Sequence, residues 1–210
     1  MPEDLKTIGD SPAREVFETA KAEMIQNEKN VRFLKRQTKG DASETGIIRW
    51  LTPILMKEFG GPIDLSDSKA TKDNALEQMR ANYPTLEDAD QNPVMIPFNS
   101  AIKFNLLIRD MSEGKERTKT NNINVFLKGA PEKVLRRCTK MLIKNTDGDI
   151  VEVDYDEAMA EGVEAANSLF GLQGERVLAF ARAELDPQDY DKDNYVFDVK
   201  SWSKWDNQQA

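Results

Sequence analysis

One short segment places a lysine where an anion could bind. Residues 125–132 read Val-Phe-Leu-Lys-Gly-Ala-Pro-Glu, an apolar run followed at once by glycine, alanine and proline. The apolar run predicts a buried strand, Gly129 allows a positive φ or the close approach of a ligand, and Pro131 suits the first position of a helix. Lys128 would then stand at the lip of a sheet beside a helix N-terminus, an arrangement that suits a phosphate. A plain strand-to-helix connection with a solvated lysine explains the same residues.

Other signatures of phosphate or nucleophile chemistry are absent from the sequence. The one Gly-Lys pair, Gly114-Lys115, lacks the preceding glycine of a G-x-x-x-x-G-K-[ST] loop, and no G-x-G-x-x-G occurs. The chain has no histidine and a single cysteine, Cys138. This excludes an internal disulfide, a zinc site and every acid–base scheme that needs imidazole. Only carboxylates and carbonyls remain to hold a metal, as they hold Mg²⁺.

The composition predicts a soluble intracellular protein with an acidic surface. The 210 residues are 39% hydrophobic and 31% charged, and the formal net charge is −8. Such a surface repels polyphosphate backbones and anionic lipid, so we expect neither nucleic acid nor direct membrane contact. No uncharged apolar run approaches the roughly 18 residues of a membrane span, and the N-terminus has no signal-peptide pattern. Any anion must therefore find a locally basic pocket.

Helix signals dominate the first part of the chain. An N-cap serine and helical spacing of apolar residues predict a helix over about residues 11–27. Asp41 with Glu44 three residues later has the pattern of a capping box and opens a second helix. That helix is expected either to be interrupted near Pro53 or to end at residues 60–62.

From Val94 the apolar period changes to two, which predicts antiparallel strands. The strand over residues 102–108 should bury one face and expose the other, and Cys138 should be a packed core thiol. Asp156 should cap a helix running to about Phe170. The remaining strands are expected at residues 94–96, 123–127, 141–144, 150–153 and 177–185. The order of elements predicts one α+β domain over residues 1–210.

Four motifs, taken together and in this order, closely resemble the nucleotide-binding domain of P-type cation-transporting ATPases, in particular the sodium/potassium and proton/potassium pump branch. They are Gly-Asp-Ala-Ser-Glu at 40–44, Pro-Phe-Asn-Ser-Ala-Ile-Lys at 97–103, Lys-Gly-Ala-Pro-Glu at 128–132 and Gly-Glu-Arg-Val-Leu at 174–178. Residues 15–36 are also similar in character, so the resemblance covers nearly the whole chain. The fold it implies is a twisted antiparallel sheet flanked by helices.

The resemblance implies an ATP site built from eight residues. Phe98 would stack on adenine, Glu44 would face the adenine amino group, and Arg176 would reach the phosphates or the ribose. Gly129 and Ala130 would leave room for the base. The other members would line the same pocket: Lys103, Asn105 and Lys128. The chain departs from the family pattern at Asn105, where a longer amide is usual, and at Ala181, where cysteine is frequent.

Four of these residues have a plainer alternative from their residue type alone. Phe98 could belong to the core, Glu44 could be only the capping carboxylate, and Lys103 could be a solvated strand residue. Arg176 could be a partner in a surface ion pair.

What the chain lacks bears equally on its function. No Asp-Lys-Thr-Gly acceptor motif and no Thr-Gly-Glu motif occurs in these residues. The resemblance therefore implies a single domain excised from a larger membrane pump, on the cytoplasmic side of what is expected to be the plasma membrane. It would present the γ-phosphate of ATP to an aspartate on a separate phosphorylation domain and so drive Na⁺/K⁺-type cation transport. Its partners would be the phosphorylation and actuator domains, with no catalytic or metal-binding residue of its own and Mg²⁺ acting in the intact pump.

Two further functions stay open at this point. One is a non-enzymatic interaction module that keeps the fold but does not bind nucleotide. The other is a free-standing phosphotransferase, which the lack of a phosphate loop, an acceptor motif and histidine argues against.

Overall fold

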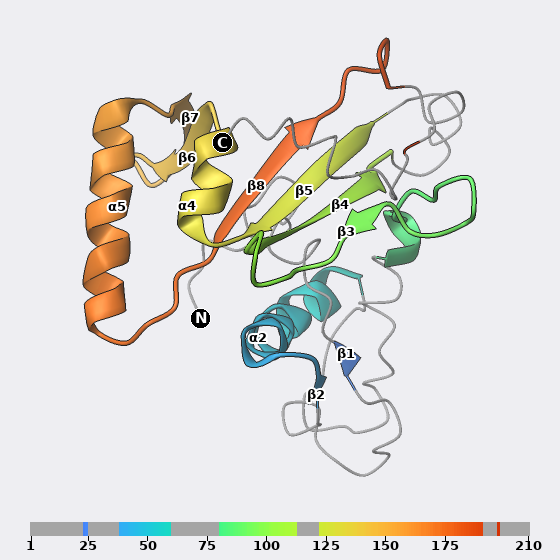
Figure 1. The fold of residues 1–210 in the computed structure, drawn as a ribbon, viewed down its shortest axis with the longest axis horizontal. Coiled ribbons are helices and arrows are strands. Elements are labelled where there is room, and N and C mark those ends of the chain that lie inside the picture. The colour runs from blue at the N-terminus through green and yellow to red at the C-terminus, as the bar shows by residue number, and fades with distance from the viewer. Residues whose placement is uncertain (1–22, 25–37, 60–79, 113–121, 191–196, 198–210) are drawn as a thin grey trace.

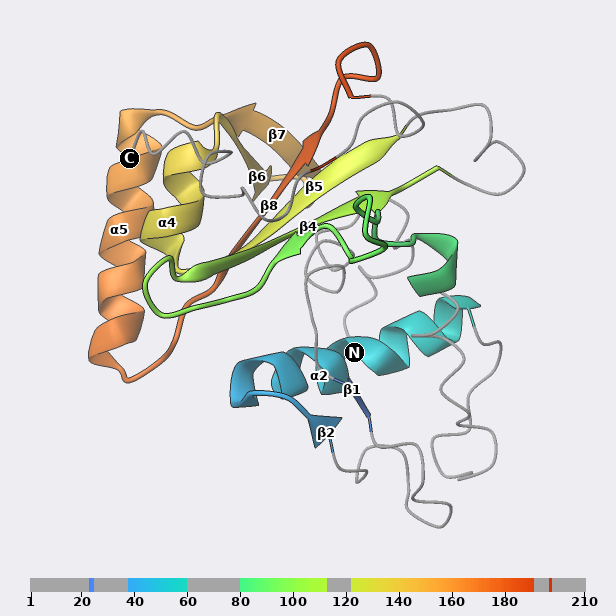
Figure 2. The same ribbon diagram turned by 45° about the vertical axis from the view of Figure 1, so that its right-hand side comes forward.

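A four-stranded antiparallel sheet forms the centre of the protein (Figure 1). The computed structural model describes residues 23–24, 38–59, 80–112, 122–190 and 197. The strand order is β3-β4-β5-β8. The strands are β3 Met95–Ile96, β4 Phe104–Asp110, β5 Ile123–Gly129 and β8 Ala179–Glu184. With helices beside this sheet in both views (Figures 1 and 2), the predicted α+β fold is confirmed.

The middle strands, β4 and β5, are buried on both faces. Each has six buried residues out of seven, and Asn105 of β4 lies opposite Lys128 of β5. The expectation of one exposed face over residues 102–108 is therefore wrong. Covering the second face buries polar side chains as well, among them Asn105 at 0% exposure and Lys128 at 5%.

Alternation along the strands divides these side chains between two faces. Phe104 and Leu127 lie on the face that packs against Val134 of the helix after β5, with Cys138 partly buried beside them. The thiol therefore belongs to this packed cluster, as expected. Further along the same face, a second cluster joins residues from both middle strands to the C-terminal region: Val94, Ile108, Ile123 and Phe197. We call this the α4 face, and the opposite one the Lys128 face.

Helix α2, Ala42–Phe59, begins at the predicted cap. Asp41 Oδ1 accepts hydrogen bonds from the backbone N–H groups of Ser43 and Glu44, at 2.8 and 3.0 Å. The helix continues through Pro53 and ends at Phe59. Of the two expected stopping points, the one before residues 60–62 is correct.

The elements after β5 follow the predicted order. The helical segment consists of α4 Pro131–Val134 and a 3₁₀ turn, η4 Leu135–Arg137. A hairpin follows, β6 Lys140–Lys144 with β7 Ile150–Asp154. Helix α5, Glu157–Leu172, starts at Asp156, whose side chain accepts from the Met159 backbone N–H at 2.9 Å.

The N-terminal helix prediction fails at the two of its residues that the structure describes. Glu23–Met24 form strand β1, which pairs antiparallel with β2, Thr38–Lys39. Apolar spacing within residues 11–27 carries no information about this partner strand, which lies more than a dozen residues away. The rest of the predicted helix lies outside the described residues. Among the helices that are described, none combines the length and the apolar character needed to cross a bilayer.

The junction of β4 and β5 requires glycine at position 129. A Cβ there would stand 2.5 Å from Lys103 O and 2.6 Å from Phe104 Cβ. Gly129 is not among the described glycines with positive φ, so the requirement is close approach by the chain itself. The space into which a Cβ of Gly129 would point is filled by Lys103 and Phe104, so it is not open to a base.

We expect Gly129→Ala to destabilise the domain by about 1–3 kcal/mol, because backbone atoms must move to admit the methyl group. Gly162→Ala is the matched control, since Gly162 lies in α5 with nothing within 4 Å of its would-be Cβ. That change should be neutral or stabilise by up to about 1 kcal/mol. Urea unfolding of both variants measures the difference, and equal midpoints would contradict the close contact.

Candidate functional site

The predicted site residues gather at the end of the sheet where β4 begins and β5 ends. Lys103 immediately precedes β4, and Ala130 immediately follows β5. The Ala130 backbone N–H donates to Lys103 O at 3.0 Å, which ties the two motifs together. Figure 2 shows the loop from β3 to β4 at this end of the sheet, next to the start of α4. Lys103, Gly129 and Ala130 are thus brought together as the resemblance implied.

A tight turn in the loop before β4 sets the position of Phe98. Asn99 Oδ1 accepts from the backbone N–H groups of Ala101 and Ile102, at 2.8 and 3.1 Å, and Asn99 O accepts from Lys103 N at 2.8 Å. Lys103 completes the turn with φ of 60°. The Phe98 ring is left 58% exposed. The alternative that Phe98 belongs to the core is therefore wrong, and a flat apolar ring faces solvent in the loop that leads to Lys103.

Lys128 is buried and paired with Glu44. Lys128 Nζ donates to Glu44 Oε1 at 2.7 Å, and the two side chains are only 6% and 13% exposed. Two alternatives fail here: Lys128 is not a solvated lysine, and the Glu44 carboxylate turns to Lys128 instead of capping its own helix. Because Asp41 caps α2, it fixes the first turn from which Glu44 reaches the Lys128 face.

Lys103 has a different partner and a different environment. Its Nζ lies 3.3 Å from Glu132 Oε1, and both side chains are about half exposed. The pKa of Glu132 is lowered mainly because the carboxylate accepts a hydrogen bond from its own backbone N–H; partial burial opposes this, and Lys103 adds to it. Since α4 has only four residues, its dipole is small and adds little to the electrostatics at this end of the sheet.

Arg176 and Asn105 complete the predicted set. Arg176 is exposed and lies three residues before Ala179, which pairs with Gly129, so it reaches the same end of the sheet. Among the described residues, no hydrogen bond or ion pair joins Arg176 or Phe98 to the two lysines. Asn105 is fully buried next to Lys128 on the Lys128 face, and it can support that lysine without being open to a ligand.

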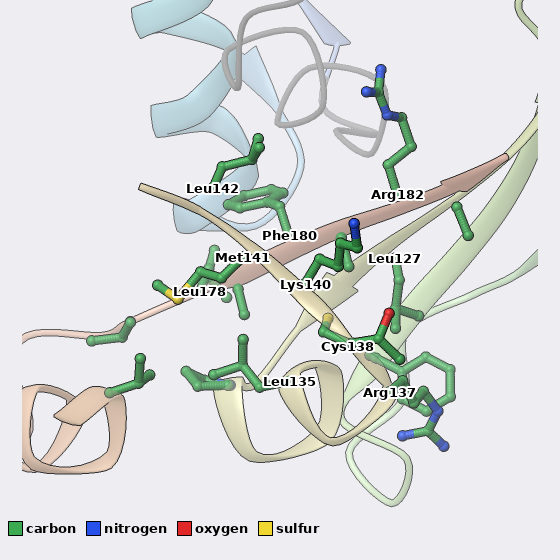
Figure 3. Close-up of a pocket in the computed structure, with 18 of the residues that line it drawn as sticks. Leu127, Leu135, Arg137, Cys138, Lys140, Met141, Leu142, Leu178, Phe180 and Arg182 are labelled. Atoms are coloured by element: carbon green, nitrogen blue, oxygen red, sulfur yellow. The ribbon is translucent and has the colours of Figure 1, made fainter. Parts of the chain in front are cut away.

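The structure also contains a groove that sequence reasoning missed. It has a volume of about 940 Å³ and is lined by the α4 face of the sheet, β6 and α5. Figure 3 shows Leu135, Met141 and Leu178 around it. None of the eight predicted site residues lines this groove. The only sequence signal for it is the apolar stripe of α5, a helix with no buried residue.

The residue types at this end of the sheet are those that contact nucleotides in proteins. An exposed aromatic ring, two lysines and an arginine lie at one end of the sheet and suit a base and its phosphates. In the part of the chain that is described, no three histidine, cysteine, aspartate or glutamate side chains converge as a metal site requires. The cations are therefore the groups of this chain that would meet a polyphosphate.

Comparison with known proteins identifies the family of this chain. The family described as "P-type ATPase, cytoplasmic domain N" matches residues 16–208. The potassium-transporting ATPase alpha chain 2 of Oryctolagus cuniculus is 29% identical over 181 residues, covering 86% of this chain and 13% of that protein. The sodium/potassium-transporting ATPase subunit alpha-2 of Gallus gallus is 32% identical over 172 residues, 82% of this chain and 13% of its own length. This chain thus spans about an eighth of the relatives it matches, and it belongs to the family of P-type ATPase cytoplasmic N domains.

Proposed function

We propose that this domain binds ATP at the end of the sheet where β4 begins and β5 ends. Adenine stacks on Phe98, and the phosphates lie near Lys103, Lys128 and Arg176. The observation that carries the proposal is the 58% exposed Phe98 ring, held outward by the Asn99 turn whose last residue is bonded to Ala130. An exposed ring outside the core, in the loop that ends at Lys103, is suited to a ligand with a flat base and negative charge.

The expected affinity is modest. A base–aromatic stack contributes roughly 1–3 kcal/mol, and each charge-assisted hydrogen bond about 1.5–3 kcal/mol. These must exceed an association cost of about 4 kcal/mol or more. Dissociation constants between about 0.1 and several mM follow, so binding experiments need ligand in the millimolar range.

In the parent protein the domain would hold ATP for a reaction completed elsewhere. The relatives are named as potassium- and sodium/potassium-transporting ATPases, and no Asp-Lys-Thr-Gly sequence occurs in this chain. We propose that the γ-phosphate is presented to an aspartate of a phosphorylation domain, with that domain and an actuator domain as partners, on the cytoplasmic side of a membrane. The contribution of this chain is positioning and charge stabilisation, and the energy released would drive cation transport.

Phe98→Ala should weaken adenosine binding by roughly 5- to 100-fold, the range expected for the loss of one stack. Lys103→Ala should change adenosine binding little, because adenosine carries no phosphate, and the two losses should converge for ATP. Because Phe98 is exposed, neither loss should come from unfolding. NMR titration of each variant measures the affinities.

Two control variants match these changes away from the site. Phe170→Ala removes another exposed phenylalanine, and Lys140→Ala removes an exposed lysine that is also ion-paired, to Glu152. Both should bind adenosine and ATP as the unsubstituted domain does. Unchanged adenosine binding in Phe98→Ala would contradict the stacking of adenine on Phe98. If no form of the domain bound either ligand, the non-enzymatic interaction module would be favoured.

Mg²⁺ should not be required for nucleotide binding by this domain and should weaken it slightly. The site offers cations to the phosphates, so a metal that neutralises the phosphates reduces the attraction without adding a ligand from the chain. EDTA should leave the ATP affinity unchanged or modestly tighter in calorimetry. Binding lost with EDTA and restored by Mg²⁺ would show a carboxylate site that involves residues such as Asp41 or Glu44.

The chain alone should neither hydrolyse ATP above background nor become phosphorylated. It has no acceptor motif and no histidine to act as nucleophile or general base. Incubation with γ-labelled ATP, acid quenching and gel electrophoresis should give no labelled band. A stable acyl phosphate on any aspartate would support the free-standing phosphotransferase instead.

A further inference from the structure

The backbone of Lys103 has a conformation that lysine rarely adopts. Its φ is 60°, in the left-handed region that crowds the Cβ of any residue except glycine. This conformation sets the direction of the Lys103 carbonyl, which accepts from the Ala130 backbone N–H at 3.0 Å. A backbone cost is thus retained at a residue whose side chain belongs to the proposed site, and such costs are typical of functional sites.

The side chain of Asn99 supplies hydrogen bonds that offset this cost. Its Oδ1 accepts from the backbone N–H groups of Ala101 and Ile102, at 2.8 and 3.1 Å. A short amide side chain can reach the N–H groups two and three residues further on, which is why asparagine favours such turns. Since the two bonds exist only while the turn is formed, they stabilise the turn together with the left-handed Lys103 at its end.

A second turn, residues 145–149, has the same kind of side-chain bonds without the strained residue. Asn145 Oδ1 accepts from the backbone N–H groups of Asp147 and Asp149, at 3.0 and 2.8 Å. The positive φ of this turn, 91°, falls on Gly148, which adopts it at no steric cost. The turn joins β6 and β7, which form a two-stranded sheet separate from the central one. It therefore serves as a reference turn with no proposed ligand beside it.

Phe98 lies between two fixed points of the chain. On one side, Ile96 is only 3% exposed and pairs with Leu106 of β4. On the other side, Asn99 begins the turn that ends at Lys103. A ring that is held before the ligand arrives does not have to be ordered by it, which lowers the cost of binding a base. If the turn opened, the chain beside Phe98 would be held on the Ile96 side alone.

We propose that Asn99 is a positioning residue for the base: it offsets the left-handed backbone of Lys103, keeps the turn closed and so fixes the Phe98 ring in the ligand-free domain. A stack depends on where the ring lies and how it is turned, whereas a lysine on its flexible stem reaches a phosphate from several positions. Loss of the Asn99 side chain should therefore weaken the binding of a nucleoside more than that of a polyphosphate. This inference rests on the proposed function and adds the residue that preorganises its base site.

Two substitutions of Asn99 test the role of its side-chain oxygen, since Asn99→Ala removes the acceptor and Asn99→Asp keeps it. In NMR titrations Asn99→Ala should bind adenosine about 3- to 10-fold more weakly, the cost of ordering one side chain on binding. It should bind inorganic tripolyphosphate within about twofold of the unsubstituted domain. Asn99→Asp should bind adenosine within about twofold. Equal losses for the two ligands, or a loss in Asn99→Asp as large as that in Asn99→Ala, would overturn the proposal.

Asn145→Ala is the matched control, because it removes the same kind of side-chain bonds from the reference turn. It should lower the midpoint of urea unfolding, as Asn99→Ala does, and yet bind adenosine as the unsubstituted domain does. The adenosine affinity then separates positioning from a general loss of stability. Equal weakening of adenosine binding in Asn145→Ala and Asn99→Ala would overturn the proposal, since the loss would then follow stability alone.

A measurement without ligand separates this proposal from ATP binding itself. Backbone ¹⁵N relaxation reports order on the picosecond-to-nanosecond timescale. The order parameters of residues 98–103 should fall in Asn99→Ala and stay unchanged in Asn99→Asp and Asn145→Ala. Unchanged order in Asn99→Ala would overturn this proposal and leave ATP binding by the domain intact. If the turn loosened as expected but the unsubstituted domain bound no adenosine, the proposed function would fail, and the positioning of a base would fail with it.

Discussion

The close contact between the end of β5 and the start of β4 is the constraint on which the site depends. Gly129 leaves so little space that Lys103 O and Phe104 lie where a Cβ would stand, and the bond from Ala130 N to Lys103 O closes the same junction. Two motifs separated by 24 residues, 97–103 and 128–132, therefore have one fixed geometry. The resulting register puts Asn105 opposite Lys128. It therefore also sets the position of Lys128 on the buried Lys128 face.

Burying a lysine in the central strand creates a second requirement, which α2 meets. An unpaired ammonium at 5% exposure would cost several kcal/mol. Glu44 offsets part of that cost, and Asp41 caps the helix that carries Glu44. The Asp41 cap positions the start of α2, and α2 in turn positions Glu44 against Lys128. A local sequence pattern thus affects the electrostatics of the site. Lys103, outside the sheet, needs no such support and accordingly has a solvated partner.

The sequence predicts what depends on neighbouring residues and fails where distant segments meet. Period-two patterns give β4, β5 and β8, and the caps Asp41 and Asp156 give the starts of α2 and α5. Strand β1 was missed because its partner lies beyond the local window, and the second buried face of β4 was missed because apolar spacing does not show what covers a sheet. Among the predicted site residues, Lys103, Lys128 and Arg176 lie at the same end of the sheet. The pairing of Lys128 with Glu44 and of Lys103 with Glu132 depends on tertiary packing. The spacing of residues in the sequence does not show it.

Two of the predicted site residues are held in different ways, Phe98 by a loop and Lys128 by the sheet. Phe98 is held by a turn whose hydrogen bonds lie within residues 99–103, and the last residue of that turn is bonded to Ala130. Lys128 is held by the core and by a buried carboxylate. In a chain of net charge −8, each of the two lysines lies against a carboxylate that balances its charge. If the domain binds ATP as proposed, selectivity for a nucleotide comes from the combination of ring and cations, since neither group alone would hold its ligand tightly.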